Sequence, residues 1–323
     1  MTPLERALHD RIRAEGPITV ESYMEACNGY YYATRDPLGA AGDFTTAPEI
    51  SQMFGELVGA ALADCWRRAR SPDAIYAELG PGRGTLAADA LRAVRASGFD
   101  GGVHFVETSP ALRAAQAQLL PDAAWHETIA GLPARPALVV ANEFLDALPV
   151  RQHVAGIERR VTIAGGLAFD RDGEVVETSP ARERAVAAIA RHLAAHGGAA
   201  LIIDYGHERA SAGETLQAVR GHRYASVLEN PGEQDLTAHV DFEAVARSAR
   251  DAGARVTRVA RQREWLAALG LDARAEALSR ANPARADDIR VAAHRLTSPE
   301  EMGELFKVIA IHSTKWPAPA GFA

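Results

Sequence analysis

Short apolar runs alternate with helical patterns through the middle of the chain. Four of these runs lack regular polar alternation, at residues 74–79, 103–107, 137–142 and 199–204. Runs of this kind are typical of strands that are buried on both faces. Helical patterns lie between them, at residues 85–97, 110–120 and 182–195. Strands that alternate with helices predict βαβ units, a mostly parallel sheet and therefore an α/β fold.

The first 70 residues have a different pattern. Apolar residues recur at helical spacing near the N-terminus, and Gly16-Pro17 breaks that run, which predicts two short helices over residues 3–27. Residues 28–49 show no clear period and contain many turn formers, so we expect a long loop there, followed by a helix over about residues 50–69. Long loops in compact domains are often functional.

Three stretches interrupt the alternating pattern, at about residues 150–178, 206–240 and 261–296. Strong turn signals in the first predict a small antiparallel insertion. The second is irregular, and the third predicts helices rich in alanine and arginine. A last apolar run, over residues 306–310, predicts an edge or antiparallel strand. We therefore expect an N-terminal helical extension with a loop that acts as a lid over residues 1–70, and one main domain with these insertions over residues 71–323.

Composition excludes several classes of protein. Hydrophobic residues make up 47% of the chain, so a sizeable core is available, and the net charge of -7 argues against a general binder of phosphate backbones. No apolar stretch approaches the roughly 18 residues of a membrane span, and the N-terminus lacks the apolar region of a signal peptide. The two isolated cysteines, Cys27 and Cys65, predict neither a zinc site nor a disulfide framework. We expect a cytoplasmic protein with reduced thiols, no nucleic-acid partner and no membrane insertion.

A glycine-rich turn follows the first predicted strand of the sheet. It reads Glu78-Leu79-Gly80-Pro81-Gly82-Arg83-Gly84. In open α/β sheets, ligands bind beyond the carboxyl ends of the strands, and glycine lets a ligand approach the backbone closely. The helix that follows offers unpaired N–H groups to an anion. That anion could be a pyrophosphate or the carboxylate of S-adenosylmethionine.

The spacing of the glycines helps to decide between these ligands. The dinucleotide fingerprint is G-x-G-x-x-G/A, whereas Thr85 stands at its third position here. The acidic Glu78 also suits the cationic ammonium and sulfonium of S-adenosylmethionine better than a pyrophosphate. A tight strand–helix connection that binds no ligand is the alternative.

An acidic residue ends the second predicted strand. Glu107, followed by Thr108, lies about 20 residues beyond the glycine turn, where a carboxylate can hold two ribose hydroxyls. The alternative is an exposed acid without function at a strand end. Turn and acid together predict a nucleoside ligand, with binding residues Glu78, Gly80, Pro81, Gly82, Gly84, Glu107 and Thr108.

Several longer segments resemble one known family, the MidA-type methyltransferases. The matching segments lie in order along the chain, at residues 42–49, 54–56, 78–84, 106–109, 141–150, 203–206, 235–242 and 302–307. The resemblance implies a Rossmann-like, seven-stranded class I methyltransferase sheet with an N-terminal extension and substrate-side insertions. It implies methyl transfer from S-adenosylmethionine. For the related mitochondrial complex I assembly methyltransferase, it implies symmetric dimethylation of an arginine on a complex I core subunit.

The run that follows the fourth predicted strand contains the candidate catalytic residues Asn142, Glu143 and Asp146. A guanidinium is charged at neutral pH, and carboxylates can orient it and stabilise it as a proton leaves. Glu143 and Asp146 are three positions apart, so one helical turn would place them on one face, towards the substrate or the cofactor amine. The alternative is that Asn142 or Asp146 caps a following helix.

Other residues are expected around the cofactor and the substrate. The segment 42–49 is a candidate lid or wall, with polar contacts from Asp43 and Thr45. Trp125 and His126 follow the expected third strand, where an adenine commonly sits, and Trp125 either stacks on it or fills the core. A peptide groove is expected beyond the fifth strand, from Asp204, Tyr205, His222 and residues 235–241. Ligand spacing for a metal is lacking, so no metal is expected.

These features favour one function over three others. The first hypothesis is a protein arginine methyltransferase that acts on a subunit of respiratory complex I. The second is a methyltransferase with another protein or a small molecule as its substrate. The third is a non-catalytic complex I assembly chaperone that binds the cofactor. A nicotinamide dehydrogenase is a distant fourth.

Overall fold

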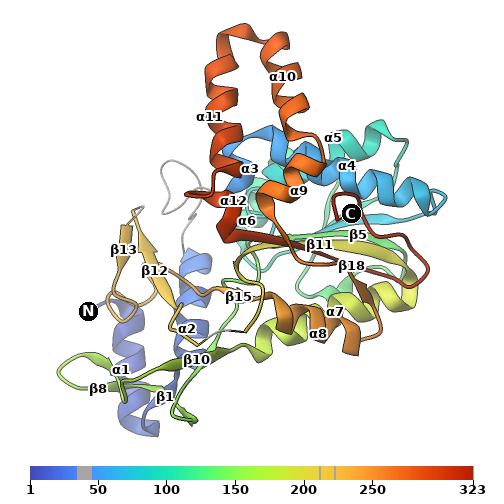
Figure 1. The fold of residues 1–323 in the computed structure, drawn as a ribbon. Coiled ribbons are helices and arrows are strands. Elements are labelled where there is room, and N and C mark those ends of the chain that lie inside the picture. The colour runs from blue at the N-terminus through green and yellow to red at the C-terminus, as the bar shows by residue number, and fades with distance from the viewer. Residues whose placement is uncertain (35–45, 211, 222, 323) are drawn as a thin grey trace.

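The computed structural model describes residues 1–34, 46–210, 212–221 and 223–322. Its centre is a sheet whose main path has the order β16-β18-β11-β5-β2-β3-β4 (Figure 1). The strands of that path are β2 Ile75–Leu79, β3 Val103–Val106, β4 Ala124–His126, β5 Ala137–Asn142, β11 Gly198–His207, β16 Arg255–Val256 and β18 Phe306–His312. Two short strands, β15 Val240–Asp241 and β17 Ala260–Arg261, pair with β11 and β18.

The strand order reverses beside β2. Strands β3 and β4 follow β2 towards one edge of the sheet, and β5 and β11 follow on its other side, all in parallel. A crevice forms at such a reversal, outside the carboxyl ends of the strands. The predicted α/β fold with a mostly parallel sheet is therefore confirmed. Strand β18 is antiparallel to β11 as one alternative foresaw, but it lies inside the sheet and not at its edge.

Helices cover both faces of the central sheet. Helices α4 and α5 pack with the α9–α12 group against one face, and α7 and α8 pack against the other (Figure 1). Their bounds are α4 Gln52–Arg68, α5 Thr85–Ala96, α6 Pro110–Leu119, α7 Pro180–His196, α8 Phe242–Asp251, α9 Gln262–Ala268, α10 Leu271–Ala281, α11 Ala286–Thr297 and α12 Met302–Leu305. The α10–α11 pair projects away from the sheet. Both strand faces are buried, which explains the apolar runs without alternation.

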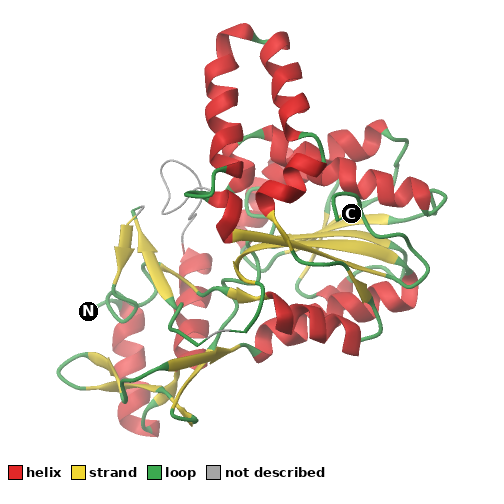
Figure 2. Cartoon of the chain, in the orientation of Figure 1, coloured by secondary structure: helices red, strands yellow, loops and turns green. Residues whose placement is uncertain are grey.

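A second core lies beside the sheet, in what we call the accessory module. It contains α1 Pro3–Glu15, α2 Val20–Thr34 and three small sheets, with buried residues from residues 8–27, 150–161 and 216–238 (Figure 2). The small sheets are β1 Ile18–Thr19 with β8 Arg160–Ile163 and β9 Leu167–Phe169; β6 Arg151–Val154 with β7 Ile157–Glu158 and β10 Val175–Thr178; and β12 Gln217–Arg220 with β13 Arg223–Ala225 and β14 Asp235–Thr237. The module thus joins the N-terminus to two insertions far along the chain.

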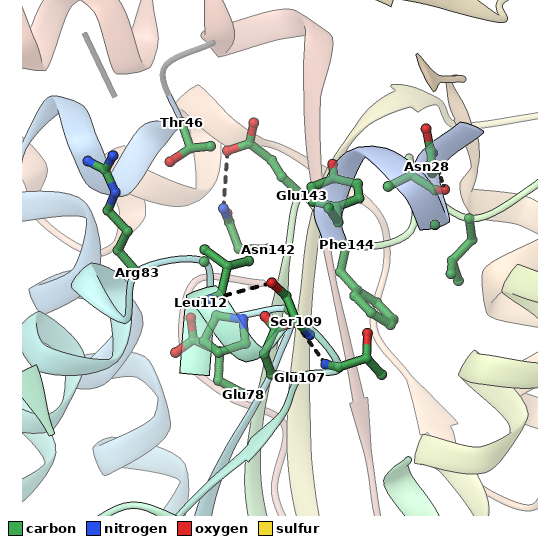
Figure 3. Close-up of a pocket in the computed structure, with 18 of the residues that line it drawn as sticks. Asn28, Thr46, Glu78, Arg83, Glu107, Ser109, Leu112, Asn142, Glu143 and Phe144 are labelled. Atoms are coloured by element: carbon green, nitrogen blue, oxygen red, sulfur yellow. Dashed lines mark hydrogen bonds between the residues drawn. The ribbon is translucent and has the colours of Figure 1, made fainter. Parts of the chain in front are cut away.

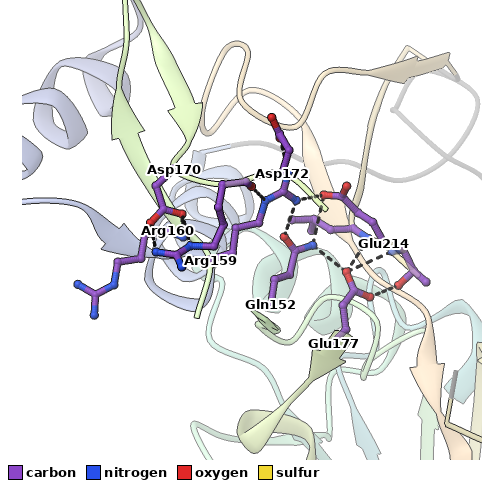
Figure 4. Close-up of polar contacts among 10 residues, drawn as sticks. Gln152, Arg159, Arg160, Asp170, Asp172, Glu177 and Glu214 are labelled. Atoms are coloured by element: carbon purple, nitrogen blue, oxygen red, sulfur yellow. Dashed lines mark hydrogen bonds and ion pairs between the residues drawn. The ribbon is translucent and has the colours of Figure 1, made fainter. Parts of the chain in front are cut away.

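A buried arginine ties two of these insertions together. Arg159 donates to Glu214 Oε1 at 2.7 Å and to Gln152 Oε1 at 3.1 Å, and its guanidinium lies 3.6 Å from the centre of the Phe169 ring (Figure 4). Glu177 accepts from the Gln152 amide at 2.8 Å. Charge-assisted bonds of this kind fix the relative position of the segments because breaking one would leave a buried charge unpaired.

Two predictions about local structure were wrong. Helix α2 continues to Thr34, so residues 28–34 are not a loop. Asn28 looked like a turn former, but its side-chain amide donates to the carbonyls of Ala147 and Leu236, which is a tertiary contact that sequence does not show. The stretch 206–240 contains the β12–β14 sheet and is not irregular throughout.

Two other predicted segments are present in the structure, and one predicted domain boundary stays open. The antiparallel insertion over residues 150–178 is present as β6–β10. The helices predicted over residues 261–296 are present as α9–α11. The domain boundary at residue 70 stays a prediction; α4, on its N-terminal side, packs against α5 over the sheet. Among the described residues, no helix combines the length and apolar character needed to cross a membrane.

Candidate functional site

A cavity of about 540 Å³ lies between the carboxyl ends of the central strands and helix α2 (Figure 3). Its volume falls within the roughly 300–1,000 Å³ of small-molecule sites. The glycine turn after β2, the residues after β3 and the residues after β5 form one side, and the accessory module closes the other. The cavity therefore lies at the strand-order reversal, where an open α/β sheet binds ligands.

The glycine turn forms a cradle on the cavity wall. Gly80, Gly82 and Gly84 have φ values of +59°, +55° and +86°, which side chains rarely allow. A Cβ added to Gly80 would also lie 2.9 Å from the Phe144 ring. Gly80, Pro81 and Gly82 line the cavity, whereas Gly84 is the N-cap of α5 and does not. At Gly80 and Gly82 the turn presents backbone to the ligand space, and Arg83 of the same turn also lines the cavity.

Glu78 lies at the floor of this cradle. Its side chain is 2% exposed, and the Tyr76 hydroxyl donates to its Oε2 at 2.7 Å. Burial raises the pKa of Glu78 to about 8, although the bond from Tyr76 acts in the opposite direction. A buried carboxylate of this kind is stabilised in its charged form by a cation placed beside it. The floor thus suits an ammonium or sulfonium.

Glu107 faces the cavity from the end of β3. Its Oε1 accepts hydrogen bonds from the backbone N–H groups of Thr108 and Ser109, each at 2.8 Å. The Gln116 amide donates to Glu107 Oε2 at 3.4 Å and to the carbonyl of Gly82 at 2.6 Å. Gln116 therefore connects the carboxylate to the glycine turn. Sequence reasoning missed it, and a glutamine on the apolar face of α6 was the available signal.

Trp125 and His126 lie outside the cavity lining. They belong to β4 itself and do not follow it, so the expected position after the strand was wrong. The Trp125 indole donates to Gln116 Oε1 at 2.8 Å, which orients the amide that contacts Glu107. His126 pairs with His104 on the neighbouring strand, with their ring nitrogens 3.0 Å apart.

Asn142 and Glu143 enter the cavity from the end of β5. Glu143 has a φ of +49°, a conformation uncommon for a residue with a side chain. Its Oε1 accepts from the Asn142 amide at 3.1 Å and from the backbone N–H of Ala47 at 3.3 Å. Burial, followed by repulsion from Asp146, raises the pKa of Glu143 to about 8. The Asn142 Oδ1 is buried and has no partner among the described residues.

Asp146 does not share a helical face with Glu143. Residues 143–148 form bends and turns, so the predicted helical turn and the alternative of a helix cap are both wrong. Asp146 does not line the cavity; it is buried behind it and hydrogen bonds to the Tyr205 hydroxyl. Asp204 accepts from the backbone N–H groups of Leu145 at 2.9 Å and Asp146 at 3.2 Å. These two bonds fix the backbone of the turn that follows β5.

A buried arginine that sequence reasoning missed fixes the same turn. Arg182 donates to the carbonyls of Leu145 and Asp146 at 2.7 and 3.0 Å, and to those of Ala238 and His239 at 2.8 and 2.6 Å. The turn after β5 is thus held to the accessory module. No sequence signal singled out this arginine among the many others.

Of the other predicted site residues, some lie outside the described residues, some line the cavity and some do not. Asp43, Thr45 and His222 lie outside the described residues. At the end of the predicted lid, Thr46, Pro48 and Glu49 line the cavity. Asp204 and residues 235–238 are buried and so cannot line the predicted peptide groove; Tyr205 and residues 239–241 do not line this cavity, and a groove there stays a prediction. In the described part of the chain, no group of three or more metal-binding side chains comes together.

Helix α2 contributes a wall that the sequence did not predict. The residues of this helix that line the cavity are Glu21, Glu25, Asn28, Gly29, Tyr32 and Ala33. Their spacing of three or four positions places them on one helical face. The loop predicted over residues 28–49 had hidden this face.

These residues fit S-adenosylmethionine. The cradle accepts a ligand against bare backbone, and α5 begins there without a side-chain cap, so its N–H groups suit a carboxylate. Glu78 suits a cationic group, and the unpartnered Asn142 Oδ1 is an acceptor for an N–H donor. Glu107 has the polarity needed for ribose hydroxyls. All four features face one cavity.

Comparisons with known proteins agree with this fit. Residues 57–164 and 157–260 match a family model described as an S-adenosyl-L-methionine-dependent methyltransferase. The chain is 35% identical to the protein arginine methyltransferase NDUFAF7 homolog of Drosophila melanogaster, over 99% of this chain and 88% of that protein. It is 31% identical to the human protein arginine methyltransferase NDUFAF7, over 96% of this chain and 83% of that protein.

A solved structure agrees with the same assignment. A crystal structure of a protein from Burkholderia thailandensis, bound to S-adenosyl-homocysteine, has a TM-score of 0.87 and 30% identity, and the match covers 99% of this chain and 94% of that one.

One expectation is corrected by the same comparisons. The sequence led us to expect a cytoplasmic protein. The names of the Drosophila, zebrafish and human relatives all place those proteins in the mitochondrion, which contradicts that expectation.

Two independent results therefore agree on the same assignment: the geometry of the cavity, and identity to curated relatives over nearly the full chain. The chain belongs to the MidA-type family of methyltransferases, enzymes that use S-adenosylmethionine as their cofactor.

Proposed function

We propose that this enzyme methylates an arginine side chain of another protein, and that the target is a subunit of respiratory complex I. The observation that carries the proposal is the carboxylate of Glu143, which is only partly exposed and lines the cavity on the side of α2 (Figure 3). The names of the relatives, which are protein arginine methyltransferases, support it. The resemblance to the complex I assembly methyltransferase supports the choice of target.

Methyl transfer requires little making or breaking of bonds by the residues of the protein. S-adenosylmethionine, when bound, supplies a methyl group that its sulfonium already activates. The residues of the chain have to align the nitrogen that receives it and exclude water. Glu143 is suited to bind a guanidinium, because its raised pKa favours the neutral form and a cation beside it returns the carboxyl to its charged form. The same carboxylate can accept the proton that the guanidinium loses.

The geometry around Glu143 favours this role. Its Oε1 accepts from Asn142 and Ala47, which fixes the carboxylate, and in this proposal the other oxygen, Oε2, binds the guanidinium. The turn that carries it is held on both sides by Arg182 and Asp204. A rigid carboxylate orients a planar guanidinium better than a mobile one, since less rotational freedom is lost on binding. Asp146 supports Glu143 from behind in this proposal, and does not contact the substrate.

The test uses the purified protein and complex I subunits from cells that lack it. We expect label from S-adenosylmethionine to enter one subunit and to appear as methylarginine after acid hydrolysis. If label enters only small molecules, the enzyme is a methyltransferase with a different substrate, which is the second hypothesis of the sequence analysis. No label, with the cofactor still bound, would support the third hypothesis, a chaperone.

A further inference from the structure

Gly29 stands inside helix α2, on the face that lines the cavity. Asn28 precedes it and holds the helix to the turn after β5 by donating to the carbonyl of Ala147 at 2.9 Å. Gly29 is the tenth of the 15 residues of α2, far from both ends. A glycine in a helix interior weakens the helix relative to alanine, so its presence calls for a reason.

The described part of the fold supplies no such reason. Gly29 has ordinary helical geometry and is not among the residues with positive φ. A Cβ added to it meets no atom of the described structure within 4 Å. Gly59 of helix α4 is a contrast, because a Cβ there would lie 2.2 Å from the carbonyl oxygen of Ala90, so close helix packing requires that glycine.

The open space at Gly29 faces the cavity on the side away from the cofactor cradle. The cradle is built from the ends of β2 and β3, whereas α2 lies across from Glu143 and Phe144 (Figure 3). One turn earlier on the same face, Glu25 is exposed and has no ion-pair partner among the described residues. Its neighbour Glu21 pairs with Arg151 at 2.6 Å. Glu25 thus places an exposed negative charge one helical turn from Gly29, while the exposed Arg184 of α7 lines the same cavity.

We propose that the acceptor polypeptide crosses helix α2 at Gly29, with its backbone in the space that a side chain would fill, so that its arginine reaches Glu143. This inference rests on the proposed function, since it assumes a protein acceptor. The missing side chain gives a main chain room to lie against the helix, and Glu25 attracts the positive charge of the incoming segment. Gly29 is then a residue that determines acceptor specificity.

The experiment compares three variants of the full chain. Gly29→Ala and Gly29→Leu add one and four carbons to the gap. Gly166→Ala is the matched control, because a Cβ there also meets nothing within 4 Å, its φ is not positive, and it does not line the cavity. For each variant, we would measure thermal unfolding, S-adenosyl-homocysteine affinity by calorimetry, and the KM and kcat for complex I subunits from cells that lack the protein.

The proposal expects stability and function to move in opposite directions. Gly29→Ala should raise the unfolding midpoint by about 1–2 °C, because alanine is the better helix former. It should also raise the KM for the acceptor about tenfold, the effect of one extra methyl group in a fitted site. Gly29→Leu should lose detectable methylation of the protein. Affinity for S-adenosyl-homocysteine should be unchanged in both, and Gly166→Ala should match the wild type.

The experiment distinguishes failure of this inference from failure of the proposed function. If Gly29→Ala methylates the subunits with wild-type KM, the inference is wrong and the proposed function stands; the alanine variant carries this test even if the leucine variant does not fold. A loss of S-adenosyl-homocysteine affinity in Gly29→Ala would also overturn it, since the gap would then belong to the cofactor. If the wild type itself labels no protein arginine, the proposed function fails and the inference fails with it.

Discussion

The side-chain amide of Asn142 donates to Glu143 Oε1 at 3.1 Å, while its own Oδ1 is buried in the cavity wall without a partner among the described residues. One residue therefore orients the proposed catalytic carboxylate and offers an unused acceptor to a ligand. Buried polar atoms are rarely left unsatisfied, so this pair marks a place that a bound molecule completes.

Replacing Glu143 with glutamine should separate binding from transfer. Glu143→Gln keeps the shape and one hydrogen-bond acceptor but removes the charge. We expect S-adenosyl-homocysteine affinity to stay within about threefold, and kcat to fall roughly 10²–10⁴-fold, the range for loss of a positioned acid–base group. Calorimetry and radiolabel transfer measure the two effects. Full transfer by a variant that still binds the cofactor would remove Glu143 from the mechanism.

The rate of transfer should depend on pH through the same residue. Burial raises the pKa of Glu143 to about 8, so the free enzyme holds this group mostly neutral at neutral pH. We expect kcat/KM for the acceptor to rise between about pH 6.5 and 8.5, because kcat/KM reports groups of the free enzyme. The rise should be absent from the residual activity of Glu143→Gln. A rise that persists in this variant would assign the titration to another group.

Cofactor binding should release a proton near neutral pH. Burial raises the pKa of Glu78 to about 8, and a cation beside it would lower that pKa again. Calorimetry of S-adenosylmethionine binding at about pH 7, in buffers of different ionisation enthalpy, should show release approaching about one proton. The release should vanish above about pH 9 and in Glu78→Gln. Equal release in this variant would mean that the ammonium does not lie beside Glu78.

Stability should fall as pH rises through the same window. Glu78 and Glu143 have folded-state pKa values raised from an ordinary 4.5 to about 8. Between these limits, the folded state binds more protons than the unfolded state, so the free energy of unfolding decreases with increasing pH and levels off above about pH 8. Urea unfolding across about pH 5–9 measures it. The double variant Glu78→Gln, Glu143→Gln should show a smaller decrease, and an identical slope would argue against these two groups.

Trp125 offers a test between stacking and positioning. Trp125→Phe keeps an aromatic ring but removes the indole N–H that holds Gln116. If Trp125 acts through Gln116 on Glu107, S-adenosyl-homocysteine affinity should fall by about tenfold, in line with the loss of one hydrogen bond. Gln116→Ala should have an effect of similar size, and the double variant should add little. Wild-type affinity in Trp125→Phe would show that the tryptophan only fills the core.

Arg182 should be among the most sensitive positions for stability. Its guanidinium is buried and donates to four backbone carbonyls. Arg182→Met would leave these carbonyls without their donor and remove a positive charge that favours the charged form of the buried Asp204, which we expect to destabilise the protein by about 3–5 kcal/mol. Denaturant unfolding measures the change. Arg184→Met, two positions later on the same helix and exposed, is the control and should change stability by less than about 0.5 kcal/mol.

Much of the fold could be predicted because it depends on local pattern. The buried runs at β2 and β5 are almost entirely apolar, so burial on both faces left a direct trace in the sequence. The glycine turn was also readable, since the positive φ values of Gly80 and Gly82 require glycine. Both features would look the same in any chain with this architecture.

The sequence misled where a distant contact decides the local structure. Asn28-Gly29 has the composition of a turn, yet the segment is helical because Asn28 bonds to residues 147 and 236, more than 100 positions away. Glu143 and Asp146 have helical spacing, yet Asp204 and Arg182 hold that segment as a turn, and only Glu143 enters the cavity.

The sequence by itself determined the sheet, the cofactor cradle and the family of this protein, because strand burial and glycine geometry act on a few consecutive residues. Only the tertiary structure decided which carboxylate faces the substrate space, that Gln116 connects the cradle to Glu107, and that α2 forms the opposite wall. These features depend on side chains from segments far apart in the chain, whose meeting is fixed by packing and by buried hydrogen bonds and not by spacing along the sequence.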